Sequence, residues 1–370
     1  MRIGLNLMWM GSSAGGVGRY ATELARELAA LPEVEETVAF AARGTPPEAV
    51  PPGATRYDLP LSTASRAALA AQAVVLPVLA MRGGLDVLHN PAAGPPAVAP
   101  RVATVVTLHD LIWLHQGEAW ESRRAQRAAR AVQFHSGRRA NRVIAGSRAV
   151  RDDLISTMRL DPDRVDVVPY GVADAQLPAA TPAAELRAQL GFGDGPVVLC
   201  VAQKRPYKNL TSLVRAVAEL RDEGVQLVLP GASTPYEDEL RALAARLGVA
   251  DRVHLPDWVS ESQLEGLYAV AGCLVLPSLM EGGGLPVLEA MRRGVPVACS
   301  DRWSLPEVAG DAALLFDPAD QDRITDAARR LLTDAELAAR LVERGRARAA
   351  QFTWRRAAEG TLEVYRRALG

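Results

Sequence analysis

Two glutamates flank a run of glycines in the stretch "SLMEGGGLPVLEAM", residues 278–291. Glu281 comes directly before the three glycines, and Glu289 lies beyond them, after Pro286. Amides that no Cβ covers, placed before a helix N-terminus, favour an anion such as a phosphate. Carboxylates repel that anion, but they accept hydrogen bonds from hydroxyl groups. The combination fits a sugar nucleotide, whose diphosphate is flanked by ribose hydroxyls on one side and sugar hydroxyls on the other.

The elements around this stretch decide whether it can act in that way. The apolar run at 273–276 predicts a strand, so Glu281 and the glycines lie on the loop at its carboxyl end. Pro286 suits the first turn of a helix, which continues over 287–293. Glu289 is then expected in about the first turn of that helix. The spacing leaves an alternative open, in which Glu281 is solvated and Glu289 only interacts with the helix dipole.

Short β-rich apolar runs alternate with longer helical patterns along the chain. This alternation predicts an α/β fold with two Rossmann-like, doubly wound parallel-sheet domains. The predicted strands are 3–7, 36–41, 86–89, 103–108, 142–145 and 165–168 in the first half, and 197–202, 226–229, 252–255, 273–276, 295–300 and 312–316 in the second. Because ligands bind at the carboxyl ends of such strands, we expect a central cleft that the two domains face.

The length of the chain also argues for two domains, since 370 residues exceed what one core usually fills. We place an N-terminal domain at 1–175, a linker at 176–190 and a C-terminal domain at 191–352. The linker is rich in alanine and proline and has no periodicity. Residues 353–370 are strongly amphipathic and predict a helix.

The composition is that of an ordinary globular protein, with 49% hydrophobic residues, 23% charged residues and a formal net charge of −1. No basic excess points to nucleic acid. Cys200, Cys273 and Cys299 form no CxxC pair and indicate buried thiols in a reducing compartment. No run approaches the roughly 18 apolar residues of a membrane-spanning helix. The N-terminal apolar run is too short for a signal peptide, so we expect a cytoplasmic protein.

The stretch "PSLMEGGGLPVLEAMRRGVPVACSD" resembles the E-x7-E region of the GT-B glycosyltransferases of family 4. The other motifs of that family occur in its order: "AGGVGRYATELARELA", "VTLHDL", "IAGSRAVRDDL", "VPYGV", "VAQKRPYKNL", "LPDWVSESQLEGLYAVAGCLVLPS" and "SLPEVAGDAALLFDP". Together they cover nearly the whole chain. The resemblance implies a GT-B fold, a nucleotide-sugar donor bound by the second domain and an acceptor bound by the first. It also implies retention of anomeric configuration, no required metal or other cofactor, and a final helix that crosses back to the N-terminal domain.

Carried over position by position, the resemblance assigns the donor site. Glu281 contacts the donor sugar, and Glu289 holds the ribose. The amides of Gly283, Gly284 and Leu285 bind the sugar and the diphosphate.

The stretch "VAQKRPYKNL", residues 201–210, holds the expected cations. Lys208 matches the family's diphosphate-binding lysine, whereas Tyr207 fills one position where that family often has arginine. Arg205 is our candidate for the second cation, and Lys204 is the alternative. Fixed cations are needed because a departing nucleoside diphosphate develops negative charge. A solvated helix-start residue is the other reading of either position.

Two further loops complete the expected site. Trp258 and Val259 lie on "LPDWVS", a loop of the kind that reads the nucleobase. His109 follows the run "VATVVTL" and is expected near the transferred sugar, where its ring or the neighbouring backbone contacts a hydroxyl; a structural histidine is the alternative. We assign His89 a structural role. Gly16 opens a helix as phosphate-binding glycines do, although a tight turn explains it equally well.

Seven arginines lie in the stretch from Trp120 to Arg142. They indicate a solvated helix face or a basic patch that meets anionic lipid or a diphosphate-linked acceptor. The apolar stretch 67–81 is either a core helix or the companion face at a membrane. The DxD strings at 161–163 and 320–322 stand where aspartate caps turns and helices, so we assign no metal.

These interpretations predict a retaining hexosyltransferase that uses a UDP- or GDP-sugar and acts on a hydroxyl of a glycan, lipid-linked or small-molecule acceptor. His109, Lys208 and Glu281 are the expected catalytic residues. The protein is then cytoplasmic, with peripheral contact to the inner face of the membrane through its N-terminal domain. Two alternatives stay open: a nucleotide-sugar epimerase of the same fold, and a non-catalytic sugar-nucleotide sensor.

Overall fold

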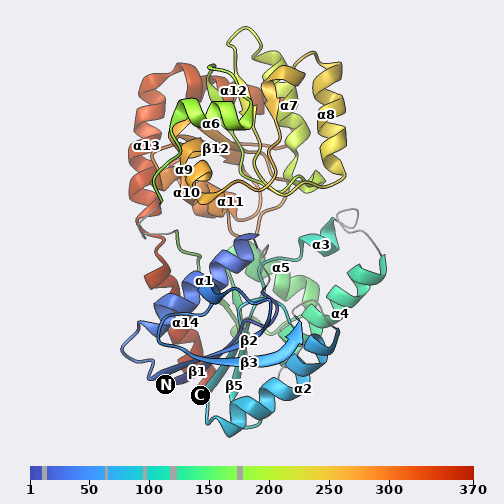
Figure 1. Ribbon diagram of the computed structural model, residues 1–370, viewed down its shortest axis with the longest axis vertical. Coiled ribbons are helices and arrows are strands. Elements are labelled where there is room, and N and C mark those ends of the chain that lie inside the picture. Colours follow the sequence, from blue (N-terminus) through green and yellow to red (C-terminus); the bar gives the residue numbers. More distant parts are fainter. Residues whose placement is uncertain (11–14, 63–65, 95–97, 117–122, 173–177) are drawn as a thin grey trace. The chain divides into compact units, whose positions relative to one another are not determined.

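A computed structural model describes residues 1–10, 15–62, 66–94, 98–116, 123–172 and 178–370. The chain forms two compact units, and each has its own parallel sheet. Unit 1 comprises Met1–Ala173 together with Phe352–Gly370, and unit 2 comprises Asp174–Gln351. The last helix therefore belongs to unit 1, where it packs against the first helix of the chain (Figure 1).

The sheet of unit 1 has seven parallel strands in the order β3-β2-β1-β4-β5-β6-β7. The strands are β1 (Arg2–Asn6), β2 (Glu36–Arg43), β3 (Thr55–Ser62), β4 (Val87–Asn90), β5 (Ala103–Thr107), β6 (Arg142–Ala145) and β7 (Val165–Val167). Six of them match predicted runs, but the prediction of six strands missed β3. This strand is at the edge of the sheet, and its sequence "TRYDLPLS" is polar and contains a proline, which edge strands tolerate.

The helices of unit 1 are α1 (Gly15–Ala29), α2 (Arg66–Arg82), α3 (Ile112–His115), α4 (Arg123–Arg139), α5 (Arg148–Met158) and α14 (Trp354–Leu369). The strand register shows which of them share a face. Leu88 pairs with Thr104, so Leu88 and Val106 point to the same side of the sheet. Leu88 packs with Leu76 of α2, and Val106 packs in the cluster that includes Phe134 of α4. Helices α2 and α4 therefore cover one face.

The opposite face receives α1 and α14 and contains a buried hydrogen-bond chain. His89 of β4 is fully buried, and its Nδ1 lies 2.7 Å from the hydroxyl of Tyr365 on α14. Its Nε2 lies 2.9 Å from the hydroxyl of Thr107, which is 3.0 Å from that of Tyr20 on α1. The chain thus joins two strands to both covering helices, and this agrees with the structural role expected for His89.

The return of the chain into unit 1 is tightly packed. Val172 forms a β-bridge with Thr353, and Gly171 lies against the backbone of Trp354. A Cβ at Gly171 would come within 2.3 Å of the Trp354 nitrogen, so only glycine fits there.

The sheet of unit 2 has six parallel strands in the order β10-β9-β8-β11-β12-β13. They are β8 (Val197–Leu199), β9 (Gln226–Val228), β10 (Val253–His254), β11 (Ala271–Leu276), β12 (Val297–Ser300) and β13 (Leu314–Phe316), and each matches a predicted run. The helices are α6 (Ala183–Leu190), α7 (Leu210–Glu219), α8 (Tyr236–Arg246), α9 (Glu261–Val270), α10 (Leu285–Arg292), α11 (Leu305–Ala309), α12 (Gln321–Thr333) and α13 (Ala335–Ala349). Cys200, Cys273 and Cys299 are free and buried, as predicted.

The linker predicted at 176–190 is partly wrong. Residues 176 and 177 lie outside the described residues, but Ala183–Leu190 form helix α6, whose Leu186 is fully buried and packs near α9. The alanine-rich composition gave no signal for this short helix, which packs through Leu186.

Strand order reverses direction once in each sheet, between β1 and β4 in unit 1 and between β8 and β11 in unit 2. Loops that leave adjacent strands at such a point diverge, and the crevice between them is the usual ligand site of an open α/β sheet. Lys208 and Glu281 follow β8 and β11, so both lie at the switch point of unit 2.

We expect His89 to make unit 1 acid-sensitive. Burial lowers the pKa of this ring from 6.5 to about 3. Between these pH values the ring binds a proton in the unfolded chain but not in the folded unit. Stability should therefore fall as the pH drops from about 6.5 towards 3, by at most about 1.4 kcal/mol per pH unit. Denaturant unfolding at pH 6, 5 and 4 measures this slope.

His89→Gln should be less stable at pH 7 because it loses hydrogen bonds, but its stability should depend less steeply on pH. His135 is exposed on α4, so His135→Gln serves as the control and should keep the wild-type slope. Identical slopes in all three proteins would contradict the assignment.

Candidate functional site

The loops that follow β8 and β11 are joined by an ion pair. The ammonium of Lys208 lies 2.6 Å from Oε2 of Glu281, and the two side chains are only 11% and 12% exposed. Lys208 ends a single 3-10 turn, Pro206–Lys208, and Asn209 then adopts a left-handed conformation, with φ of 54°, before α7 begins. Asparagine tolerates that conformation better than most residues, which explains the Lys-Asn pair. The Asn209 side-chain amide also donates to the Pro318 carbonyl, at 2.8 Å.

The electrostatics of this pair depend on burial. Burial disfavours the charged form of Lys208, but the Glu281 carboxylate outweighs that effect, so the pKa of the ammonium is raised above 10.5. The ring of Tyr207 lies beside the same ammonium, 5.1 Å from its centroid. Lys208 is therefore a permanent cation in a largely desolvated position.

The backbone of Glu281 is held by the loop that follows β12. The Ser304 hydroxyl is fully buried and donates to the main-chain oxygen of Glu281 at 2.7 Å. After Glu281, Gly284 adopts a φ of 60° and caps α10, and a Cβ there would lie 3.2 Å from Leu305. The amides of Gly283, Gly284 and Leu285 thus stand at the N-terminus of α10, ahead of Val287, whose amide bonds back to Gly284.

Glu289 lies in the second turn of α10, one turn later than expected, because the helix begins at Leu285. The residue is only 7% exposed, and its Oε2 accepts a hydrogen bond of 2.9 Å from the Tyr268 hydroxyl on α9. The ring of Tyr268 in turn lies under the guanidinium of Arg293, which pairs with Glu265. The carboxylate is consequently fixed in position by residues from two helices.

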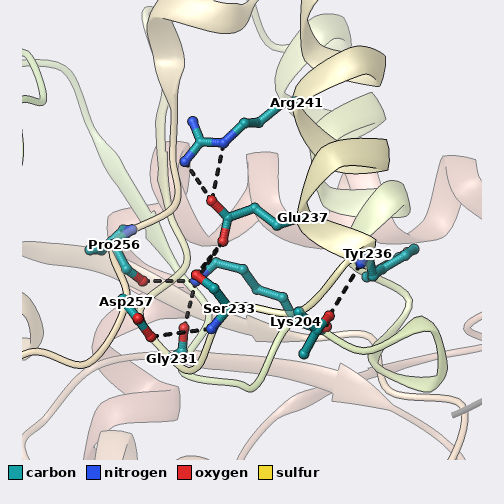
Figure 2. Close-up of polar contacts among 9 residues, drawn as sticks. Lys204, Gly231, Ser233, Tyr236, Glu237, Arg241, Pro256 and Asp257 are labelled. Carbon is teal, nitrogen blue, oxygen red and sulfur yellow. Dashed lines mark hydrogen bonds and ion pairs between the residues drawn. The ribbon is translucent and has the colours of Figure 1, made fainter. Parts of the chain in front are cut away.

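The two alternatives for the second cation differ sharply. Lys204 is fully buried, and its ammonium donates to the carbonyls of Gly231 at 2.5 Å and Pro256 at 2.8 Å, with Glu237 at 3.6 Å (Figure 2). Two hydrogen bonds and one ion pair therefore hold this ammonium within unit 2. Arg205 is only half-buried. Of the two, Arg205 is the one whose charge a ligand can reach.

The loop expected to read a nucleobase follows β10, on the far side of β9 from β8. Trp258 is 56% exposed and Val259 is half-buried. Ser260 then begins α9 with a capping box that involves Gln263. The loop therefore presents an aromatic face to its surroundings while its end is fixed by the helix.

His109 lies in unit 1, directly after β5. Its Nε2 is 2.9 Å from the Pro91 carbonyl, which can only accept, so Nε2 carries the proton and Nδ1 accepts from the Tyr170 hydroxyl at 2.6 Å. Burial lowers the pKa of this ring to about 4, which keeps it neutral. Both ring nitrogens are thus hydrogen-bonded within unit 1. Gly16 is exposed in the first turn of α1.

The two DxD strings act as caps. Asp161 accepts from the amide of Asp163 and begins a 3-10 turn, and Asp320 accepts from the amide of Arg323 and begins α12. Among the residues that the structure describes, no group of three or more His, Cys, Asp or Glu side chains is arranged to hold a metal ion. Likewise, no helix in the described part of the chain is both long and apolar enough to cross a membrane.

Comparisons with known proteins decide the family. The model for glycosyl transferases group 1 matches residues 183–348, and that for glycosyltransferase family 4 matches residues 14–176. A D-inositol 3-phosphate glycosyltransferase of Frankia alni is 33% identical over 96% of this chain and 95% of its own. The chain is a group 1 glycosyltransferase.

Two other proteins extend the comparison. The MMP alpha-(1->4)-mannosyltransferase of Mycolicibacterium hassiacum is 31% identical over 78% of this chain and 72% of its own. The Anabaena protein HepE, solved in complex with UDP-glucose, superposes with a TM-score of 0.74, at 20% identity over 98% of both chains. At that identity the likeness establishes the fold alone, and the glycosyltransferase has the two parallel-sheet domains of the GT-B class.

Several residues that hold the site of this glycosyltransferase were not foreseen from its sequence. Tyr268 orients Glu289, Ser304 holds the backbone of Glu281, and Tyr170 is hydrogen-bonded to Nδ1 of His109. Each lies more than twenty residues from its partner or on a different element, so no local sequence pattern predicts the contact. Tyr170 lies in the motif "VPYGV", but that motif does not predict its contact with His109.

We expect the Lys208–Glu281 pair of the glycosyltransferase to be strongly coupled. Lys208→Met or Glu281→Gln leaves the other charge buried without its partner, which should cost about 3 kcal/mol. The double change should cost clearly less than the sum. Hydrogen exchange of the β8 and β11 amides measures the opening free energy.

Arg340 and Glu336 form an exposed i,i+4 pair on α13 and provide the matched control. Breaking that pair should change stability by less than about 0.5 kcal/mol. Strict additivity of the two site substitutions would show that Lys208 and Glu281 do not depend on each other.

Proposed function

We propose that this glycosyltransferase transfers a hexosyl unit from a UDP- or GDP-sugar to a hydroxyl group, with retention of anomeric configuration and without a metal. The acceptor is a glycan, a lipid-linked saccharide or a small polyol. One observation carries the proposal: the permanent cation Lys208 and the carboxylate Glu281 meet at the switch point of unit 2, beside the N-terminus of α10. A doubly charged leaving group flanked by hydroxyls fits this arrangement of charges.

The roles in donor binding follow from the chemistry of each group. A bound diphosphate would share the Lys208 ammonium with Glu281 and accept from the amides of Gly283, Gly284 and Leu285. Arg205 supplies a second charge to the phosphates. Glu281 and Glu289 accept from hydroxyls of the sugar and of the ribose, and Trp258 and Val259 line the base. The relative named as a mannosyltransferase supports a hexosyl donor.

In the proposed reaction, the acceptor oxygen bonds to the anomeric carbon on the face from which the diphosphate departs. The bond between that carbon and the phosphate oxygen breaks, and the leaving oxygen takes the acceptor proton, so atoms and charge balance. The protein contributes fixed electrostatics: Lys208 and Arg205 offset the charge that develops on the leaving group. We assign His109 a contact with the transferred sugar through its main-chain carbonyl, since its ring is already hydrogen-bonded.

Donor binding and transfer test the proposal. Thermal shift with UDP-, GDP- and ADP-sugars should identify one donor, because a ligand at 100 times its Kd adds about 2.7 kcal/mol. With that donor and no acceptor, slow release of nucleoside diphosphate should appear, and EDTA should not abolish it. Lys208→Met should lower kcat/KM about 100-fold. Glu289→Gln should weaken donor binding about tenfold.

Arg340→Met removes an exposed cation of unit 2 and serves as the control, with unchanged turnover expected. Binding without any release of diphosphate would favour the sugar-nucleotide sensor, and a product with inverted anomeric configuration by NMR would refute retention.

We further propose that unit 1 contacts an anionic membrane surface. On α2, Leu76 and Ala80 are buried, whereas Val74, Val75, Val78 and Met81 are 66%, 38%, 36% and 39% exposed. Their spacing forms an apolar stripe on one side of the helix. Helix α4 covers the same face of the sheet and exposes Arg127, Arg130, Arg138 and Arg139. Trp120 and the side chains of Arg123 and Arg124 lie outside the described residues. An apolar stripe beside a basic helix fits an anionic lipid surface.

Vesicle sedimentation tests this contact. The protein should bind vesicles of phosphatidylglycerol and not those of phosphatidylcholine, since each basic residue near an anionic surface adds about 1 kcal/mol. A variant with Val74→Ser, Val78→Ser and Met81→Gln should bind at least about tenfold more weakly. A control with Leu279→Ser, an exposed apolar residue of unit 2, should bind as the wild type does. Self-association through α2 without vesicle binding would contradict the proposal.

A further inference from the structure

The chain contains 42 lysines and arginines, and only two of them are lysines, Lys204 and Lys208. Both lie within five residues of each other after β8, and both are buried. Lys208 is part of the proposed donor site, whereas nothing in that function uses Lys204. An ionisable side chain with no exposed surface is costly unless its hydrogen bonds are complete, so its position calls for a reason.

Lys204 connects the loops that leave three neighbouring strands. Its ammonium donates to Gly231, in the loop after β9, and to Pro256, in the loop after β10 (Figure 2). Its own amide donates to the Ala232 carbonyl at 3.1 Å, and its carbonyl accepts from the Thr234 hydroxyl. Lys204 thus links the loops after β8, β9 and β10 through its side chain and its backbone, in addition to the hydrogen bonds that the Gly231 amide makes to the Pro256 and Asp257 carbonyls.

The carboxylates near Lys204 are also held by hydrogen bonds. Glu237 lies 3.6 Å from the Lys204 ammonium and accepts from the Ser233 hydroxyl at 2.6 Å and from Arg241 Nε at 3.0 Å. Asp257 accepts from the Ser233 amide at 3.2 Å. Burial lowers the pKa of Lys204, and the nearby charges of Glu237 and Asp257 offset only part of that shift.

The packing explains why a lysine stands here in a chain that otherwise uses arginine. An ammonium presents three donors on a narrow stem, which suits two carbonyls and a carboxylate around one point. A guanidinium is planar and wider. Gly231 leaves no spare room either, since a Cβ there would lie 2.3 Å from the Ala202 carbonyl oxygen.

We propose that Lys204 is a positioning residue for nucleobase selection: by holding the Pro256 carbonyl it sets the position of the loop that carries Trp258 and Val259. The inference rests on the proposed donor function, because it assigns those two residues to the base. Lys204 itself contacts no ligand. Its removal would leave the Gly231 carbonyl without its Lys204 donor, the Pro256 carbonyl with only the Gly231 amide, and Glu237 without this ion-pair partner. The loop after β10 would lose the contact that ties it to β8.

Matched substitutions at the two lysines test this. Titration calorimetry should rank UDP, GDP and ADP on the wild-type protein. Lys204→Met should weaken binding of the preferred nucleotide roughly tenfold, which is the loss expected from one charge-assisted hydrogen bond. It should also reduce the difference in affinity between that nucleotide and the other two. Inorganic pyrophosphate, which has no base, should bind as it does to the wild type. Lys208→Met should give the opposite pattern, with weaker pyrophosphate binding and an unchanged ranking of the bases.

Hydrogen exchange provides a readout that needs no nucleotide. In Lys204→Met the amides of 231–233 and 257–260 should exchange faster, while those of β11 and α10 keep their wild-type rates. Glu237→Gln retains the amine and should show the same changes at smaller amplitude, so it replaces Lys204→Met if that variant does not fold.

An equal loss for pyrophosphate and all three nucleotides, or unchanged exchange at 257–260, would overturn the proposal. Failure of the donor function would look different, because the wild-type protein itself would then bind no nucleotide. Exchange at 257–260 would still decide whether Lys204 positions the loop.

Discussion

Unit 2 of this glycosyltransferase is organised around one ion pair, in which Lys208 and Glu281 approach to 2.6 Å with little access to water. Neither charge is tolerable alone at that depth, so each fixes the loop of the other. Parallel topology makes the meeting possible, because β8 and β11 are neighbours at the point where strand order reverses. The N-terminus of α10 follows Glu281 directly, so positive potential and a hydroxyl acceptor lie side by side before any ligand arrives.

The buried histidine and lysine side chains described above are neutral in unit 1 and charged in unit 2. In unit 1, His89 and His109 are kept neutral by burial, and both nitrogens of each ring are hydrogen-bonded within the unit. In unit 2, the corresponding loops carry full charges, and these are balanced by short contacts. Neutral rings with complete hydrogen bonds stabilise the fold of unit 1 without adding charge to it. The fixed charges of unit 2 suit the diphosphate binding that we propose for it.

Much of this could be read from the sequence, and the failures have physical causes. Twelve of the thirteen strands follow from apolar runs, but β3 is a polar edge strand with a proline and has no such signature. Lys208, Glu281 and the glycine loop were placed correctly after their strands, because strand-loop-helix order is local. The buried state of Lys204 was not predictable, since its acceptors at Gly231 and Pro256 are distant in the chain. The same holds for Tyr268, which approaches Glu289 only through helix packing.

The connectivity of the chain sets an order of events during synthesis. Unit 1 is interrupted by the whole of unit 2, and α14, which packs on the sheet of unit 1, follows unit 2 in the chain. Until then the face of β5 and β6 that α14 covers is bare, and His89 lacks its Tyr365 partner. Unit 2, by contrast, is continuous, and all its strands precede α14 in the chain. Unit 1 is therefore translated first but finishes folding last. Its uncovered apolar face must avoid aggregation while unit 2 is synthesised.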